Sequence, residues 1–117
     1  MARLGDPELH MDIAVTMHHS FDQLVVSGEL DLATAPMLSD ALARSTQPVL
    51  VDLSNLTFID SSGLNVLIAN AAALTRARDR DVAVLVVPHG AVRRVFELTA
   101  LDEVFELVDT LDGSNLA

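Results

Sequence analysis

The segment from Val49 to Leu74 constrains the fold more than any other part of the chain, because it predicts a buried strand, a short connection and a helix. Four of the five residues from Val49 to Leu53 are branched and apolar, which is typical of a strand covered on both faces. Beyond the connection, apolar residues recur at the spacing of one helix face, at Leu64, Leu67, Ile68, Ala71 and Leu74. The pattern predicts a helix of roughly 18 residues that begins within a residue or two of Ser61.

The start of this predicted helix combines capping residues with a small residue. Asp60, Ser61 and Ser62 all favour helix N-termini, and Gly63 is expected to keep the approach to the serines open. Free N–H groups and the helix dipole at such a terminus favour an anion, for example a phosphoryl group. Serines at helix starts are most often only caps, so that interpretation stays open beside the one of a modified hydroxyl.

Composition limits the class of protein. With 117 residues the chain can form one domain with its own core, and the absence of cysteine excludes disulfides and thiolate metal sites. A net charge of −10 disfavours nucleic acid and anionic membranes as partners, and it suits a partner with a basic face. Neither a membrane-length apolar run nor a signal-peptide core is present in the sequence. We therefore expect a cytoplasmic protein without membrane insertion.

The order of the patterns predicts a single α/β domain. Strands are predicted at 13–17, 24–30, 49–53, 82–87 and near 107–108. Helices are predicted at 36–44, from residue 61, and at 89–99, with a partial helix in the tail from 109. We expect a mixed sheet, made of an N-terminal hairpin plus parallel strands, packed against about four helices. The expected limits are a flexible lead-in at 1–10, the domain at 11–112 and a tail at 113–117.

Residues for catalysis are sparse. A nucleophilic serine needs a base within reach, yet the chain has no lysine and no G-x-S-x-G elbow. Any of the four histidines could lie near Ser61 in space, but nothing in the spacing favours it, and each is expected at the surface or a strand edge: His10, His18, His19 and His89. Neither a zinc motif nor a phosphate-binding glycine loop occurs. We expect no enzyme, no metal and no cofactor; a small hydrolase that uses Ser61 is the alternative, which labelling by a fluorophosphonate would reveal.

Several segments together are similar to one protein family. They are Gly28-Glu29-Leu30-Asp31, Thr34-Ala35, Val51-Asp52-Leu53-Ser54, Phe58-Ile59-Asp60-Ser61-Ser62-Gly63-Leu64, and the later Leu98-Thr99-Ala100-Leu101 and Val104-Phe105. On these segments the chain resembles the STAS domain family from about Ile13 to about Asp109. More closely, it resembles the bacterial anti-sigma factor antagonists.

The resemblance implies a partner-switching regulator of transcription in the bacterial stress response. The unphosphorylated protein would bind an anti-sigma factor, typically also a serine kinase of GHKL type, and so free a sigma factor. Phosphorylation of Ser61, with Ser62 as second choice, would weaken that binding because it adds negative charge beside Asp60. A serine phosphatase would reverse the change.

The resemblance also implies where the partner binds. The expected surface is the loop from Asp31 to Thr34 together with the start and exposed face of the helix, and it includes Asp31, Thr34, Asp60, Ser62, Gly63, Asn65 and Ala69. An alternative from a different class is a STAS scaffold subunit of a signalling or lipid-transport complex. Such a subunit would use the same surface without a switch.

Overall fold

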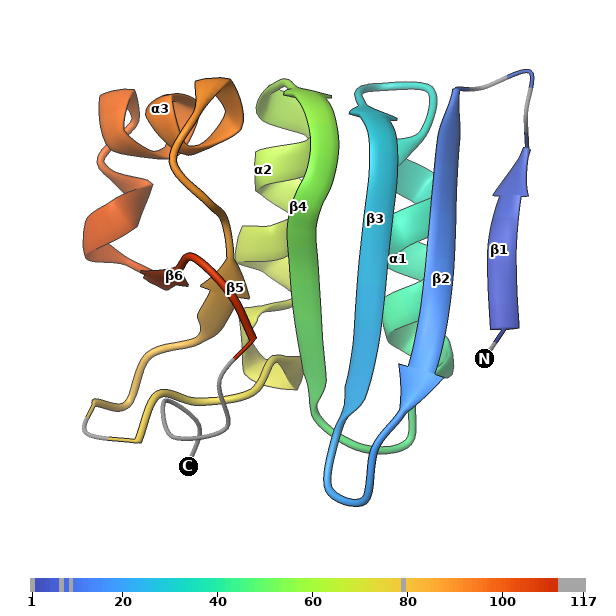
Figure 1. The fold of residues 1–117 in the computed structure, drawn as a ribbon, viewed down its shortest axis with the longest axis horizontal. Coiled ribbons are helices and arrows are strands. Elements are labelled where there is room, and N and C mark those ends of the chain that lie inside the picture. Colours follow the sequence, from blue (N-terminus) through green and yellow to red (C-terminus); the bar gives the residue numbers. More distant parts are fainter. Residues whose placement is uncertain (1, 7, 9, 79, 112–117) are drawn as a thin grey trace.

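The computed structural model describes residues 2–6, 8, 10–78 and 80–111, which form one mixed sheet flanked by helices (Figure 1). Six strands follow one another across the sheet in sequence order: β1 (Ala2–Asp6), β2 (Met11–Met17), β3 (Asp22–Leu30), β4 (Val49–Ile59), β5 (Val84–Val86) and β6 (Glu106–Val108). The neighbours from β1 to β3 are antiparallel, and those from β3 to β6 are parallel. This arrangement confirms the predicted combination of an N-terminal hairpin and parallel strands.

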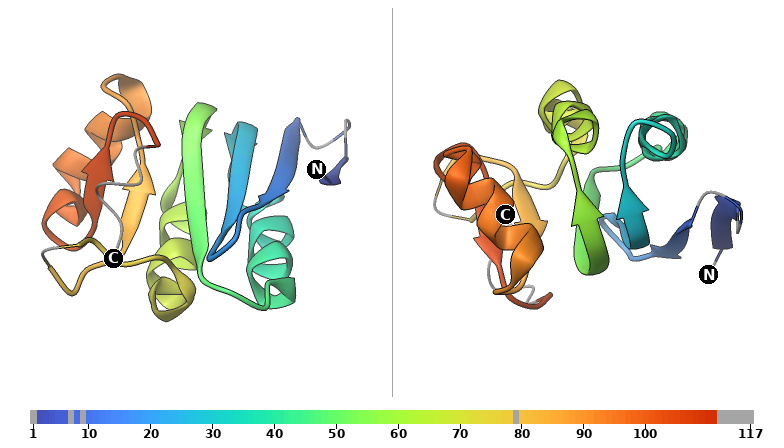
Figure 2. Two further views of the ribbon diagram at one scale, coloured as in Figure 1. Left: turned by 60° about the horizontal axis from the view of Figure 1, so that its bottom comes forward. Right: turned by 90° about the horizontal axis from the view of Figure 1, so that it is seen from above.

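The described residues contain three α-helices, α1 (Ala35–Arg44), α2 (Ser61–Ala69) and α3 (Ala91–Leu98), rather than about four. Helices α1 and α2 lie on one face of the sheet, and α3 lies at the end of the sheet formed by β5 and β6 (Figures 1 and 2). The fourth helix was expected in the tail, of which residues 109–111 are not helical and 112–117 lie outside the described residues.

Helix α2 begins at Ser61 as predicted but ends at Ala69, so the prediction of about 18 residues was wrong. The side-chain amide of Asn70 donates to the Val66 carbonyl at 2.7 Å and closes the last turn. After a short 3-10 turn, Leu74 is extended and bridges to Val49. The helical apolar spacing continues past Ala69 because Leu74 is buried by joining the sheet, not by continuing the helix.

Strand β4 lies in the middle of the sheet, and its first half, 49–53, is buried on both faces, as its apolar run predicted. The strand continues to Ile59, through residues that were expected to form a connection, and there Ser54, Asn55, Thr57 and Phe58 are exposed. Val49, Val51 and Leu53 belong to the main core, which they share with residues of α1 and α2, namely Leu38, Leu42, Leu64 and Leu67. Leu50 packs on the opposite face with Val84 and Val86. The strand therefore fixes the position of α2, which follows it directly in the chain.

The first strand occupies residues that were expected to form a flexible lead-in. Ala2–Asp6 pairs with β2 so that Leu4 lies opposite Ile13. This pairing uses main-chain groups along the edge of β2. The sequence of residues 2–6 has no side-chain pattern that would predict it. The domain limits of 11–112 and the tail at 113–117 stay predictions.

Candidate functional site

Two loops meet at one edge of the sheet because β3 and β4 are parallel neighbours. Leu30 pairs with Ile59 at the carboxyl ends of these strands, and the Asp60 N–H donates to the Leu30 carbonyl at 3.1 Å. The segments that follow, Asp31–Thr34 and Asp60–Ser62, therefore lie side by side at the upper edge in Figure 1. Carboxyl ends of parallel strands are where open α/β sheets usually place their functional sites.

Asp60 is the N-cap of α2. Its Oδ1 accepts hydrogen bonds from the backbone N–H of Ser62 at 2.8 Å and of Gly63 at 3.4 Å. A carboxylate in this position satisfies N–H groups that the helix leaves unpaired and also interacts favourably with the helix dipole. The anion that occupies this helix terminus is thus a side chain of the protein itself.

Asp31 makes similar bonds in the neighbouring loop, within the turn that precedes α1. Its Oδ1 accepts from the N–H of Ala33 at 3.0 Å and of Thr34 at 3.1 Å, and the chain then enters α1. The hydroxyl of Thr34 donates to the Glu29 carbonyl at 2.8 Å and accepts from the Asp31 N–H at 2.8 Å. Thr34 is fully buried, so its expected role in the partner surface was wrong: it fixes the shape of the loop from inside.

Gly63 is also buried and cannot contribute to a partner surface. A Cβ atom at this position would lie 2.6 Å from Leu30 Cγ and 3.0 Å from Ile59 Cγ1. The glycine therefore lets the first turn of α2 approach the ends of β3 and β4 closely. Its expected role of keeping the serines accessible was wrong, since the space beside it is filled by the core.

The exposed face of α2 begins at Ser61. Ser61 and Asn65 are exposed and Ser62 is half-buried. Ile68 lies about two turns beyond Ser61 on the same face and is 45% exposed. The spacing of apolar residues had placed Ile68 on the inner face of the helix, and that prediction was wrong. The face of α2 that packs on the core is narrow, so Ile68 lies on the solvent side.

Two further apolar residues near this edge were not singled out by sequence reasoning, although Leu32 lies in the loop that was expected to bind the partner. Leu32, at the tip of the Asp31–Thr34 loop, is 77% exposed, and Phe58, two residues before Asp60, is 48% exposed. The signal for Leu32 was its position in a turn, between Asp31, which is half-buried, and Ala33, which is exposed. Exposed apolar residues with a polar rim are typical of protein interfaces.

The charges of this surface are acidic. Asp31 uses Oδ1 to bond the N–H groups of its turn and Asp60 uses Oδ1 to cap α2, and among the described residues no hydrogen bond is found for either Oδ2. Neither loop contains a basic residue. We define the switch surface as Asp31, Leu32, Asp60, Ser61, Asn65 and Ile68: two carboxylates and a serine hydroxyl among apolar side chains.

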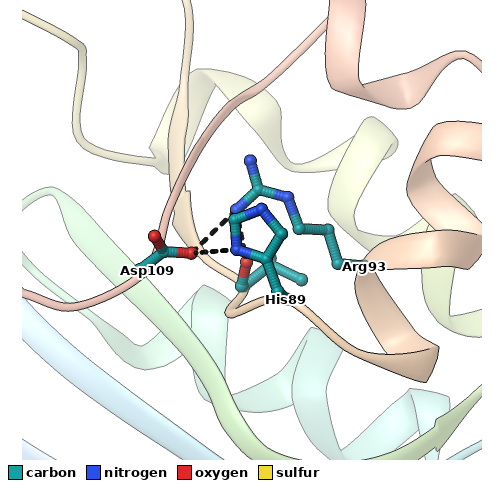
Figure 3. A network of polar contacts seen from close by, with 4 residues as sticks. His89, Arg93 and Asp109 are labelled. Atoms are coloured by element: carbon teal, nitrogen blue, oxygen red, sulfur yellow. Dashed lines mark hydrogen bonds and ion pairs between the residues drawn. The ribbon is translucent and has the colours of Figure 1, made fainter.

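A second polar cluster lies at the carboxyl end of β5 (Figure 3). Asp109 Oδ1 contacts His89 Nδ1 at 3.0 Å and Arg93 Nη1 at 3.1 Å, and Arg93 Nη1 also donates to the Val87 carbonyl at 3.0 Å. The cluster ties the segment after β6 to the start of α3. A groove of about 280 Å³ runs beside it, between Ser54 and Thr57 of β4 and the Pro88–Val92 segment.

The described part of the chain has no histidine bonded to Ser61, no cluster of metal ligands and no membrane-spanning helix. His18 bonds to Gln23 and His89 to Asp109, and no bond joins a histidine to Ser61 in residues 10–78 and 80–111. No group of three or more potential metal ligands is found among the residues that were placed. Within those same residues, every helix is too short or too polar to cross a membrane.

Comparison with known proteins identifies the family. The sequence model described as "Mlab, STAS domain" matches residues 13–109, most of the chain. The chain belongs to the STAS domain family. The resemblance drawn from the motifs around Asp31 and Asp60 is thereby confirmed, and the expected α/β architecture agrees with it.

Individual relatives of the chain are named as anti-sigma factor antagonists. An anti-sigma-B factor antagonist of Staphylococcus epidermidis is 29% identical over 103 residues, which cover 85% of this chain and 94% of the relative. The crystal structure of an anti-sigma factor antagonist from Mycobacterium paratuberculosis is 34% identical, covers 95% of both chains and has a TM-score of 0.75. The phosphorylated Bacillus protein SpoIIAA, at 15% identity and TM-score 0.54 over 82% of this chain and 90% of its own, shares the fold.

The geometry around Gly63 makes a prediction about stability. Helix propensity alone would make Gly63→Ala stabilising by about 1 kcal/mol. The overlap with Leu30 and Ile59 instead predicts a loss of about 1–3 kcal/mol in the free energy of unfolding, measured by urea denaturation. Asn65→Ala, on the exposed face of the same helix, is the control and should change stability little. A Gly63→Ala protein as stable as the wild type would contradict the close packing.

Proposed function

We propose that this STAS domain is an anti-sigma factor antagonist that binds its partner through the switch surface and is switched off by phosphorylation of Ser61. Support comes from relatives that cover 85% or more of the chain and are named anti-sigma factor antagonists. The observation that carries the proposal is the exposed Ser61 hydroxyl at the first position of α2, in the middle of a surface with apolar residues and two aspartates.

Ser61 is a better phosphoacceptor than Ser62. Ser61 is exposed at the first helical position, whereas Ser62 is half-buried. The Cα–Cβ bond of a helical residue tilts towards the helix N-terminus, so the Ser61 side chain points away from the helix body. A kinase can reach that hydroxyl without unfolding the first turn.

Phosphorylation would act by charge. A phosphoserine carries about −1.5 to −2 charges at neutral pH, and on Ser61 it would join the carboxylates of Asp31 and Asp60. Although an acidic surface attracts basic groups, a bulky dianion beside Leu32 and Ile68 must lose its water when the partner binds, and we expect this desolvation cost to exceed the attraction. Partner binding should weaken while the fold of the antagonist stays the same, because Ser61 is not part of the core.

The remaining roles follow from the same proposal. The anti-sigma factor would also be the serine kinase, of GHKL type, and a serine phosphatase would restore the binding form; the setting would be the cytoplasm of a bacterium. Ser61 would be a substrate of other enzymes, and the chain itself would catalyse nothing. The scaffold alternative differs in one respect: it requires the same surface but leaves Ser61 unmodified.

The proposal is tested by three baits in lysate from the source organism: wild type, Ser61→Ala and Ser61→Asp. Wild type and Ser61→Ala should capture the same kinase-like protein, and Ser61→Asp should bind it at least about tenfold more weakly, equivalent to about 1.4 kcal/mol, by calorimetry with the purified partner. Mass spectrometry of wild type recovered from cells should find phosphate on Ser61. Equal capture by all three baits with Ser61 unmodified would favour the scaffold alternative.

The apolar part of the switch surface is tested by a matched pair of leucines. Leu32 is 77% exposed within the surface and Leu98 is 80% exposed at the end of α3. Leu32→Ser should weaken partner binding by about 1–2 kcal/mol, because a buried interface leucine contributes roughly that much, whereas Leu98→Ser should leave the affinity unchanged. Equal effects of the two substitutions, measured by calorimetry, would remove Leu32 from the interface.

A further inference from the structure

Three of the four N–H groups at the N-terminus of α2 are already bonded before any phosphoryl group arrives. A helix leaves four N–H groups unpaired at this end, here those of residues 60–63. The Asp60 N–H bonds to the Leu30 carbonyl, and the Ser62 and Gly63 N–H groups bond to Asp60 Oδ1. Only the N–H of Ser61 has no bond among the described residues. Sequence reasoning had expected these donors to be free for an anion.

We propose that the Asp60 carboxylate keeps the phosphoryl group of phospho-Ser61 out of the helix cap and so holds its charge at the partner surface. The inference rests on the proposed function for Ser61. Asp60 would be a positioning residue: besides its place in the switch surface, it occupies the Ser62 and Gly63 N–H groups that could otherwise neutralise the phosphate.

The Asp60 carboxylate and a phosphoryl group on Ser61 would compete for the N–H groups of Ser62 and Gly63, and we expect the carboxylate to keep them. Asp60 reaches the Ser62 N–H at 2.8 Å from the N-cap position, and its backbone is fixed by the bond from its own N–H to Leu30. A phosphoryl group on Ser61 could reach the same donors only by displacing a carboxylate, which would leave two like charges adjacent. With the donors occupied, the phosphoryl group stays in solvent until a partner approaches, and it then opposes binding at full charge.

Two substitutions of Asp60 separate the effect of occupying the Ser62 and Gly63 N–H groups from the effect of the negative charge of Asp60. In Asp60→Asn the side-chain oxygen still caps the helix but carries no charge, and in Asp60→Gly the donors are free while the N-cap conformation is well tolerated. Each protein is produced with and without phosphoserine encoded at position 61, so that phosphorylation does not depend on kinase recognition. Amide resonances of Ser62 and Gly63 report the donors, and a phosphorus-31 titration reports the second ionisation of the phosphate.

In the wild type and Asp60→Asn, phosphorylation should leave the Ser62 and Gly63 amide resonances nearly unchanged. In Asp60→Gly both should move downfield, and the second pKa of the phosphate should fall by roughly half a unit relative to Asp60→Asn, as expected for an anion at a helix N-terminus. A downfield shift of the same size in the phosphorylated wild type would overturn the inference, because the phosphate would then have displaced Asp60. Amides elsewhere in α2 show whether each variant retains the helix.

These spectra need no partner, so they distinguish this inference from the proposed function. Partner binding is then measured for the phosphorylated wild type and phosphorylated Asp60→Gly, each against its unphosphorylated form. The inference expects the fold-loss in affinity on phosphorylation to be smaller in Asp60→Gly. If the amides behave as expected but phosphorylation weakens binding in neither protein, the proposed switch fails while the role of Asp60 as the occupant of the cap stands.

Discussion

The parallel pairing of β3 with β4 is the interaction on which the rest of the structure depends. Because Leu30 and Ile59 are paired at the carboxyl ends of the two strands, the loops after them emerge at the same edge and their helices pack on the same face. The apolar run of β4 makes this possible, since a strand that is buried on both faces can be flanked by strands on each side and covered by helices. A loop from residue 31 and a helix from residue 61 thus form one surface, although they are 30 residues apart.

In each of the two aspartates of that surface, one carboxylate oxygen stabilises the fold and the other is available for the proposed function. Asp31 and Asp60 each begin a turn or helix through Oδ1, which gives the helix starts fixed positions. Their second oxygens make no hydrogen bond among the described residues, and the two carboxylates give the surface its acidic character. Thr34 and Gly63, which neighbour them in the sequence motifs, act from inside: one bonds the loop backbone and the other admits the helix to the core.

Sequence patterns predicted the fold well where periodicity and burial coincide. The hairpin, the central strand and the start of α2 at Ser61 followed from apolar spacing and capping residues. The end of α2 did not, because Leu74 satisfies a helical pattern while it bridges to Val49 in the sheet. Strand β1 could not be predicted either, since its pairing uses main-chain groups of β2. In the site, motif residues were located correctly along the chain, but their exposure depends on tertiary packing: Thr34 and Gly63 proved to be buried, and Leu32 and Ile68 exposed.

The central claim is that the partner binds at the edge where β3 and β4 end. The most direct measurement is a nitrogen-15 correlation spectrum of this protein during titration with the anti-sigma factor from the same organism. The account predicts that the amides which shift or broaden first are those of residues 31–33 and of the exposed side of α2 from Ser61 to Ile68. Changes centred instead on the groove between β4 and α3, around Ser54 and His89, would contradict it.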